Sequence, residues 1–219
     1  MIQKIERIPT PLLEYTQSFF AFTHHLSGHK RPRFATLGPS GTSSESAARF
    51  LLSTLEIEKG EVCLFATFED AFESMLNGSS DFLLVANAYD RINTFYMSME
   101  AQFIFSFVFK TAPYGLAKRA DFKIPRANQL AVATHPAPVS LIPYFLSMYA
   151  VTADVILVRS TSEAAQKTRD GEFDLCVTNA LAAKEYQLEF ASPVFAIKML
   201  WSVFCRRTLD EYSLKEKED

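Results

Sequence analysis

Short apolar runs alternate with amphipathic stretches from residue 33 onward. Capping residues precede two of these stretches: Ser43 or Ser44 opens one that reaches about residue 55, and Thr67 opens one that ends at Asn77-Gly78. Both carry apolar residues at helical spacing, and the runs around them have the length of buried strands. The predicted strands of this first set are 34–37, 62–65 and 82–85. Such alternation is typical of an α/β fold with a largely parallel sheet.

A second set of the same kind follows two runs rich in aromatic and β-branched residues, 103–109 and 114–118. The further predicted strands are 130–134, 155–158, 175–177 and 198–205, and the further predicted helices are 138–149, 162–169 and 179–186. Two alternating sets joined by extended crossings predict two α/β lobes with a ligand cleft between them. We expect lobe 1 at 31–110 plus 190–206 and lobe 2 at 111–189, with an N-terminal extension (1–30) and a charged tail (207–219) outside them.

Composition narrows the classes of partner. The 219 residues are 48% apolar and carry a net charge of −3 without a basic cluster, which disfavours nucleic acid. No apolar run approaches the roughly 20 residues of a membrane span. Cys63, Cys176 and Cys205 are widely spaced and predict reduced thiols in a cytoplasmic protein. The seven glycines form neither a Walker loop nor a Gly-x-Gly-x-x-Gly fingerprint, so no nucleotide cofactor is expected.

Polar residues recur where a predicted strand is followed by a helix. After the first strand the chain turns through Gly38-Pro-Ser-Gly41 and begins a helix with hydroxyl side chains, and two later helices begin in the same way. Helix starts at the carboxyl edge of a sheet present free N–H groups and a positive dipole end to an anion. Each could equally be an ordinary helix cap. The candidate binding residues at these starts are Thr42, Ser43, Ser44, Ser162, Thr178 and Asn179.

Other candidates follow the predicted strands. His135 lies between a strand ending at Thr134 and the Pro136-Ala-Pro138 turn, where an imidazole could reach a ligand. Asn87 and Tyr89 follow the third strand, and Tyr114 begins a later one. Thr134, the last residue of its strand, is a further candidate for substrate binding. His24, His25 and His29 lack the spacing of metal ligands, so no metal site is expected. The residues alone therefore predict a two-lobed protein that binds a small anion.

Taken together, the ordered motifs resemble the prephenate dehydratase family over residues 33 to 206. They are Leu37-Gly-Pro-x-Gly-Thr42, Thr67-Phe-Glu69, His135-Pro136 and Ser160-Thr-x-x-Ala-Ala165. Within that family, further motifs resemble the non-aromatizing prephenate decarboxylases of bacilysin-type antibiotic pathways. These are Gly41-Thr-Ser-Ser-Glu45, Ala88-Tyr-Asp90, Phe95-Tyr-Met97, Tyr114-Gly-Leu-Ala117, His135-Pro-x-Pro138 and Trp201-Ser-x-Phe204.

The resemblance implies a two-lobed fold of the type II periplasmic-binding-protein kind, with no regulatory domain, no cofactor and a homodimer as the candidate assembly. Met199-Leu200-Trp201 stands where a dehydratase carries Thr-Arg-Phe, whose threonine helps to expel the ring hydroxyl. Without an acid there, the site would release carbon dioxide from prephenate and keep the hydroxyl, giving dihydro-4-hydroxyphenylpyruvate.

The same resemblance suggests roles for the candidates. Helix starts at Thr42 to Ser44 and at Ser162 would hold the anion, and Met199, Leu200 and Trp201 would form an apolar wall. His135 is the first candidate for the proton donor, with Tyr89, Tyr114 and water as alternatives. Two other functions stay open at this point: a dehydratase that makes phenylpyruvate, and a small-anion binding protein without catalysis.

Overall fold

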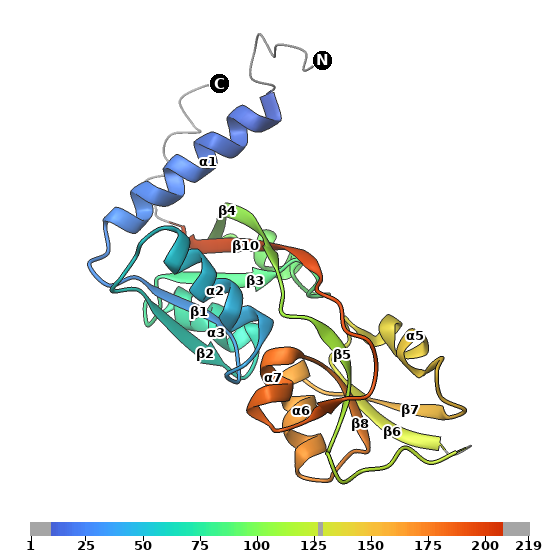
Figure 1. The fold of residues 1–219 in the computed structure, drawn as a ribbon. Coiled ribbons are helices and arrows are strands. Elements are labelled where there is room, and N and C mark those ends of the chain that lie inside the picture. The colour runs from blue at the N-terminus through green and yellow to red at the C-terminus, as the bar shows by residue number, and fades with distance from the viewer. Residues whose placement is uncertain (1–9, 127–128, 208–219) are drawn as a thin grey trace.

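The computed structural model describes residues 10–126 and 129–207 and contains two five-stranded sheets, one for each half of the molecule (Figure 1). The first sheet has the strand order β2-β1-β3-β10-β4 and the second has the order β7-β6-β8-β5-β9. The strands are β1 (Arg33–Leu37), β2 (Glu61–Phe65), β3 (Phe82–Ala86), β4 (Ala101–Lys110), β5 (Tyr114–Lys118), β6 (Gln129–Thr134), β7 (Thr152–Leu157), β8 (Leu175–Asn179), β9 (Glu189–Phe190) and β10 (Lys198–Arg206).

Both sheets are mixed rather than largely parallel. The βα units give parallel pairs, β1 with β2 and β3, and β6 with β7 and β8. In contrast, β10 runs antiparallel to β3 and β4, and β5 runs antiparallel to β8 and β9. These antiparallel strands are the ones that carry the chain between the halves. Strand β9 straddles the lobe boundary expected at residues 189 and 190, and the lobe limits themselves stay a prediction.

Two extended crossings, 111–113 and 191–197, join the sheets and contact each other. The N–H of Thr111 donates to the carbonyl of Ile197 (2.9 Å), and the N–H of Ile197 donates to Oγ1 of Thr111 (3.2 Å). The two crossings therefore lie side by side between the halves, as Figure 1 shows.

The helices largely follow the predicted segments. They are α2 (Ser43–Thr54), α3 (Phe68–Leu76), α4 (Asn93–Tyr96), α5 (Ile142–Leu146), α6 (Thr161–Arg169) and α7 (Ala180–Glu185), with a 3₁₀ turn at Val139–Leu141. Two predictions were wrong in detail. Thr42, not Ser43 or Ser44, caps α2, because its backbone is extended and its side chain accepts from the N–H of Glu45. The helix expected over 138–149 is a 3₁₀ turn and the short α5, since Pro143 has no N–H to continue the hydrogen-bond ladder.

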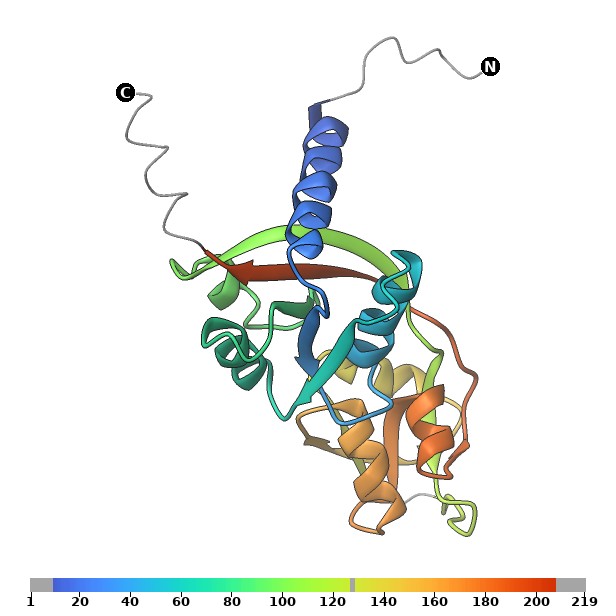
Figure 2. The same cartoon turned by 90° about the vertical axis from the view of Figure 1, so that its left-hand side faces the viewer.

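The N-terminal extension contains a helix, α1 (Thr10–Ser27), that the sequence analysis did not assign. Its Phe22 is fully buried and stacks on Phe105 of β4 with ring centroids 5.0 Å apart. Phe19 also packs on Phe105, and the hydroxyl of Tyr15 donates to the carbonyl of Ser106 in β4 (3.1 Å). The N-terminal end of α1 points away from the first sheet (Figure 2). The charged tail expected at 207–219 lies almost wholly outside the described residues.

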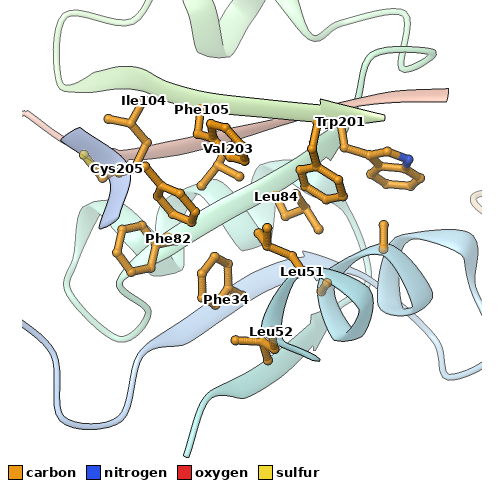
Figure 3. Packing of buried hydrophobic residues seen from close by; sticks show 14 residues of the cluster. Phe34, Leu51, Leu52, Phe82, Leu84, Ile104, Phe105, Trp201, Val203 and Cys205 are labelled. Carbon is orange, nitrogen blue, oxygen red and sulfur yellow. The ribbon is translucent and has the colours of Figure 1, made fainter. Parts of the chain in front are cut away.

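The first sheet encloses an aromatic core (Figure 3), in which Phe34 and Phe82 stack at 4.8 Å and Trp201 closes one end. In the second half, α6 and α7 pack on the sheet through small side chains. This cluster includes Ala117, Ala133, Ala164, Ala165, Ala182 and Ala183.

Candidate active site

A cavity lies between the two halves, where several strands end. Leu37 and Ala86 are the last residues of β1 and β3, and His135 directly follows β6. This is the carboxyl edge at which open α/β sheets bind ligands. The lining residues are Leu37, Thr42, Ser43, Ser44, Phe68, Ala86, Ala88, Tyr89, Tyr114, His135, Ala137, Pro138, Ser160, Thr161, Met199 and Trp201.

The start of α2 forms one polar side of the cavity. Thr42, Ser43 and Ser44 are all buried, and all three line it. The hydroxyl of Thr42 is used by the fold, because it donates to the carbonyl of Leu37 (2.9 Å) and accepts from the N–H of Glu45 (3.1 Å). The N–H groups of Ser43 and Ser44 belong to the first helical turn and have no acceptor within the helix. They are available to an anion, and the helix dipole favours one there.

Glu45 would oppose such an anion if its charge faced the cavity. Instead its carboxylate accepts from the N–H of Gly41 (2.8 Å) and from Ser40 and Arg49 (each 2.9 Å). Burial raises the pKa of Glu45, but these hydrogen bonds outweigh it and leave the pKa below its ordinary value. The negative charge is thus held on the far side of the turn by Arg49.

The start of α6 forms a second polar side of the cavity. It was expected at Ser162, but the residues that line the cavity are the two before it. Ser160 caps the helix by accepting from the N–H of Glu163 (3.0 Å), and Ser160 and Thr161 line the cavity. Ser162 is fully buried outside the lining, and its Oγ has no hydrogen-bond partner within the described chain. The Ser-x-x-Glu spacing of a capping box, at Ser160 and Glu163, was the signal that could have identified the cap.

Three other polar candidates are absent from the lining and bond to the fold instead. Thr134 donates to the carbonyl of Val177 (3.1 Å), and Thr178 donates to the carbonyl of Thr161 (2.8 Å). Asn179 caps α7 through its Oδ1 and donates from its Nδ2 to the carbonyl of Gly41 (3.2 Å). Thr178 thereby holds the start of α6, and Asn179 ties the second half to the turn before α2.

Asn87 and Leu200 also lie outside the cavity lining. Asn87 accepts from the hydroxyl of Ser202 (2.8 Å) through its Oδ1. Leu200 is 44% exposed, because side chains alternate along β10 and its neighbours Met199 and Trp201 face the cavity. The apolar wall in the structure consists instead of Leu37, Phe68, Ala86, Ala88, Met199 and Trp201.

Tyr114 contributes a hydroxyl from the second half. The side chain is buried, and its oxygen forms a hydrogen bond with Oγ of Ser43 in the first half (2.8 Å). Burial raises the pKa of Tyr114, with Ser43 acting in the opposite direction. Tyr114 therefore stays a neutral hydrogen-bonding group that links the two halves.

Tyr89 is held in a polar cluster at the cavity mouth. Its hydroxyl donates to Glu69 (2.5 Å) and accepts from Nε of Arg91 (3.0 Å). Burial and the bond to Glu69 raise the pKa of Tyr89 to about 12. Its proton is thus committed to a carboxylate, so Tyr89 is poorly placed to give that proton to a ligand.

His135 is half-buried at the junction of this cavity with a neighbouring one. Its Nδ1 accepts from the N–H of Ala137 (3.2 Å), so the neutral ring carries its hydrogen on Nε2. Burial lowers the pKa of His135, and the nearby charge of Asp90 opposes that shift. The ring is mainly neutral at pH 7 before any anion binds.

Among the described residues, no Asp, Glu, Lys or Arg side chain lines the cavity between the halves, which we call the main cavity. Two arginines line the neighbouring cavity that shares His135 with it. Arg91 pairs with Glu69 (2.8 Å) and Arg159 pairs with Glu163 (3.1 Å). An anion in the main cavity is thus met by hydroxyl and N–H groups rather than by a cation. Within residues 10–126 and 129–207, no cluster of three metal-ligating side chains occurs and no helix is long and apolar enough to cross a membrane.

Comparison with known proteins places this chain in one family. Residues 34–194 match the family model described as prephenate dehydratase. The chain therefore belongs to the prephenate dehydratase family, a class of two-lobed proteins. It is 39% identical over 184 residues to the prephenate decarboxylase of Bacillus subtilis (strain 168), a match that covers 80% of this chain and 87% of the relative.

Solved structures agree on the architecture. The prephenate dehydratase from Arthrobacter aurescens, in complex with L-Phe, superposes with a TM-score of 0.60 at 16% identity; the match covers 80% of this chain and 61% of that one. The periplasmic VFT2 domain of Bordetella pertussis BvgS gives 0.53 at 16% identity, covering 87% and 86%. The predicted periplasmic-binding-protein-like fold is confirmed.

Proposed function

We propose that this chain is a carboxy-lyase that releases carbon dioxide from prephenate without aromatizing the ring. Its relationship to the prephenate decarboxylase of Bacillus subtilis supports this activity. The observation that carries the proposal is the cavity itself: donors for an anion at two helix starts face an apolar wall that contains Met199 and Trp201 and no titratable side chain.

The polar and apolar sides divide the substrate between them. The pyruvyl carboxylate and keto group bind the first-turn N–H groups and hydroxyls at the starts of α2 and α6. The ring lies against the apolar wall, where its own carboxylate is poorly solvated. The charged carboxylate is therefore destabilised on the ring, which favours its departure as carbon dioxide.

The reaction balances without a cofactor. The bond between the ring and its carboxylate breaks, its electron pair spreads over the ring diene, and a proton is added to a ring carbon. The hydroxyl on the opposite ring carbon stays, because hydroxide is a poor leaving group unless an acid protonates it. The product is dihydro-4-hydroxyphenylpyruvate, a precursor suited to antibiotic-type metabolites.

His135 is our candidate for the proton donor. It is neutral in the free protein because burial lowers its pKa, but a substrate with two negative charges beside it favours the imidazolium form. Tyr114 is already paired with Ser43, and the proton of Tyr89 is paired with Glu69. His135 is thus the lining residue whose proton is most readily transferred.

Incubation of the protein with prephenate tests the proposal. We expect carbon dioxide release above the spontaneous rate together with a non-aromatic product. The strong absorbance of phenylpyruvate would instead indicate a dehydratase, and no acceleration would indicate a binding protein.

A double variant tests why dehydration is absent. Met199→Thr with Leu200→Arg restores the dehydratase pattern at the wall, and we expect a minor share of phenylpyruvate by chromatography. Because Leu200 faces away from the cavity, Met199→Thr alone should give most of that effect. An unchanged product in both variants would contradict the assigned role of this segment.

We also propose a cytoplasmic homodimer. Cys63 and Cys176 form no disulfide within the described residues, which supports a reducing compartment. Exposed apolar side chains on α1, including Leu12 (52%) and Phe20 (65%), support self-association. Sedimentation of the wild type and of a Leu12→Glu/Phe20→Glu variant measures it, and a monomeric wild type would refute the dimer.

A further inference from the structure

Trp201 is the single tryptophan of the chain and lies where the aromatic core meets the cavity. It is 1% exposed, and on β10 it pairs with Ala86 of β3 and Phe107 of β4. Neighbouring strands therefore hold its backbone on both sides. The position of the indole ring is set by the first sheet, not by a mobile loop.

The indole nitrogen of Trp201 is a buried donor without an acceptor in the described part of the chain. An indole N–H can only donate a hydrogen bond, and a buried donor left unpaired lowers stability. In the view of Figure 3, the nitrogen lies on the side of the ring that points away from Leu84, Val203 and the other labelled core residues. An oxygen atom of a ligand in the cavity would remove this cost.

The surroundings of this N–H indicate which end of a ligand it meets. The other residues of the apolar wall, such as Met199, Phe68 and Ala86, have no polar hydrogen in their side chains. The remaining donors of the lining lie at the starts of α2 and α6 and on Tyr89, Tyr114 and His135. The indole N–H is therefore the donor that the apolar wall itself offers, beside the part of the cavity that takes an apolar ring.

We infer that Nε1–H of Trp201 donates a hydrogen bond to the ring hydroxyl oxygen of bound prephenate and thereby positions the ring. This inference rests on the proposed function. Tryptophan has no side-chain titration in the range of the ionisable residues, so it holds the hydroxyl without supplying a proton for its departure. No bond is made or broken by this contact. It favours a bound ring that keeps its hydroxyl.

Two replacements separate the N–H from the bulk of the ring. Trp201→Phe removes both the N–H and part of the ring volume. Substitution of tryptophan by β-(3-benzothienyl)alanine during expression replaces the N–H with sulfur and keeps the bicyclic shape, and it affects one site because the chain has one tryptophan. We expect kcat/KM for prephenate to fall about tenfold in both proteins, as for the loss of one hydrogen bond.

Phe105→Leu is the matched control, since Phe105 belongs to the same core but does not line the cavity. It should lower the melting temperature and leave kcat/KM unchanged. The sulfur analogue should show the reverse: kcat/KM falls, and the melting temperature is not lowered. The N–H that it loses has no partner in the free protein, so its removal costs no stability. Wild-type kcat/KM in the sulfur analogue would overturn the inference.

A direct readout uses the single indole resonance of protein labelled with nitrogen-15. We expect its proton to move downfield on saturation with 4-hydroxyphenylpyruvate, which has the ring hydroxyl, and to move less with phenylpyruvate, which lacks it. Equal movement with both, or none with either, would overturn the contact to the hydroxyl. Carbon dioxide release by the wild type is measured in parallel, so failure of the proposed function is recognised separately from failure of this contact.

Discussion

The core of the first sheet is built from aromatic rings, whereas the core beneath α6 and α7 in the second half is built largely from alanine. Phe22, Phe34 and Phe82 contact one another in the first, while Ala164 and Ala165 place α6 directly against β6 and β8 in the second. Large rings fix a rigid apolar wall that ends in Trp201. Small side chains let a helix approach the sheet closely and bring its first turn to the cavity. The two cores thus produce the two chemical sides of one site.

The largest effect should come from removing a ring of the aromatic core. Phe82→Ala leaves a cavity beside Phe34 and Phe22 and should lower the free energy of unfolding by about 3–5 kcal/mol, measured with urea. Phe50→Ala is the control, because Phe50 is 42% exposed and should cost much less. Equal losses would mean that the rings of the first core are not its main source of stability.

Removing the imidazole supplied by the second half should have the next largest effect. His135→Asn keeps a polar side chain in the lining but cannot transfer a proton, so we expect turnover of prephenate to fall about 10²-fold. KM should change little, because the donors at the starts of α2 and α6 are intact. A variant that turns over at the wild-type rate would move the proton donor to water or another side chain.

A moderate effect should follow from enlarging an alanine. Ala165→Leu overpacks the contact between α6 and the sheet and should cost about 1–3 kcal/mol of unfolding free energy. It should also raise KM for prephenate, because it displaces Ser160 and Thr161. Gln166→Leu adds a similar side chain on the exposed face of α6 and serves as the control. An unchanged KM in Ala165→Leu would mean that the start of α6 does not contribute to substrate binding.

The smallest effect should be in the pH dependence of stability. Burial lowers the pKa of His135 below its ordinary value of 6.5, so the unfolded chain binds a proton more readily than the native protein. The stability from the neutral ring is fully present above about pH 6.5 and declines as the pH falls below it. Urea unfolding at pH 7.5 and 5.5 should show a larger loss in the wild type than in His135→Asn. The other histidines are common to both proteins, so an equal loss would contradict the assignment to His135.

Local signals in the sequence were sufficient for much of this architecture. Thr67 caps a helix as expected, and Gly78 and Gly171 adopt the positive φ angles of 80° and 84° that a helix end requires. Each of these helix starts and ends is determined by residues close to it in the sequence. Together they define the order of strands and helices along the chain.

Features that depend on distant segments were not accessible in this way. Helix α1 was not predicted, because its burial depends on the ring of Phe105 some eighty residues away. Thr134 and Thr178 have the residue type of ligand-binding groups, but carbonyl groups of other elements take their hydroxyls. The outward position of Leu200 could have been predicted, because side chains alternate along a strand and Leu200 therefore faces the other side from Met199 and Trp201.

The paired crossings at Thr111 and Ile197 have a mechanical consequence. Every covalent link between the halves passes through this one narrow strip, so a rotation that widens the cavity bends the strip and leaves both sheets intact. Such a rotation must also break the hydrogen bonds that join the halves outside the strip, between Ser43 and Tyr114 and between Gly41 and Asn179. Access for a substrate is thus governed by a few polar contacts that lie beside the place where the substrate binds.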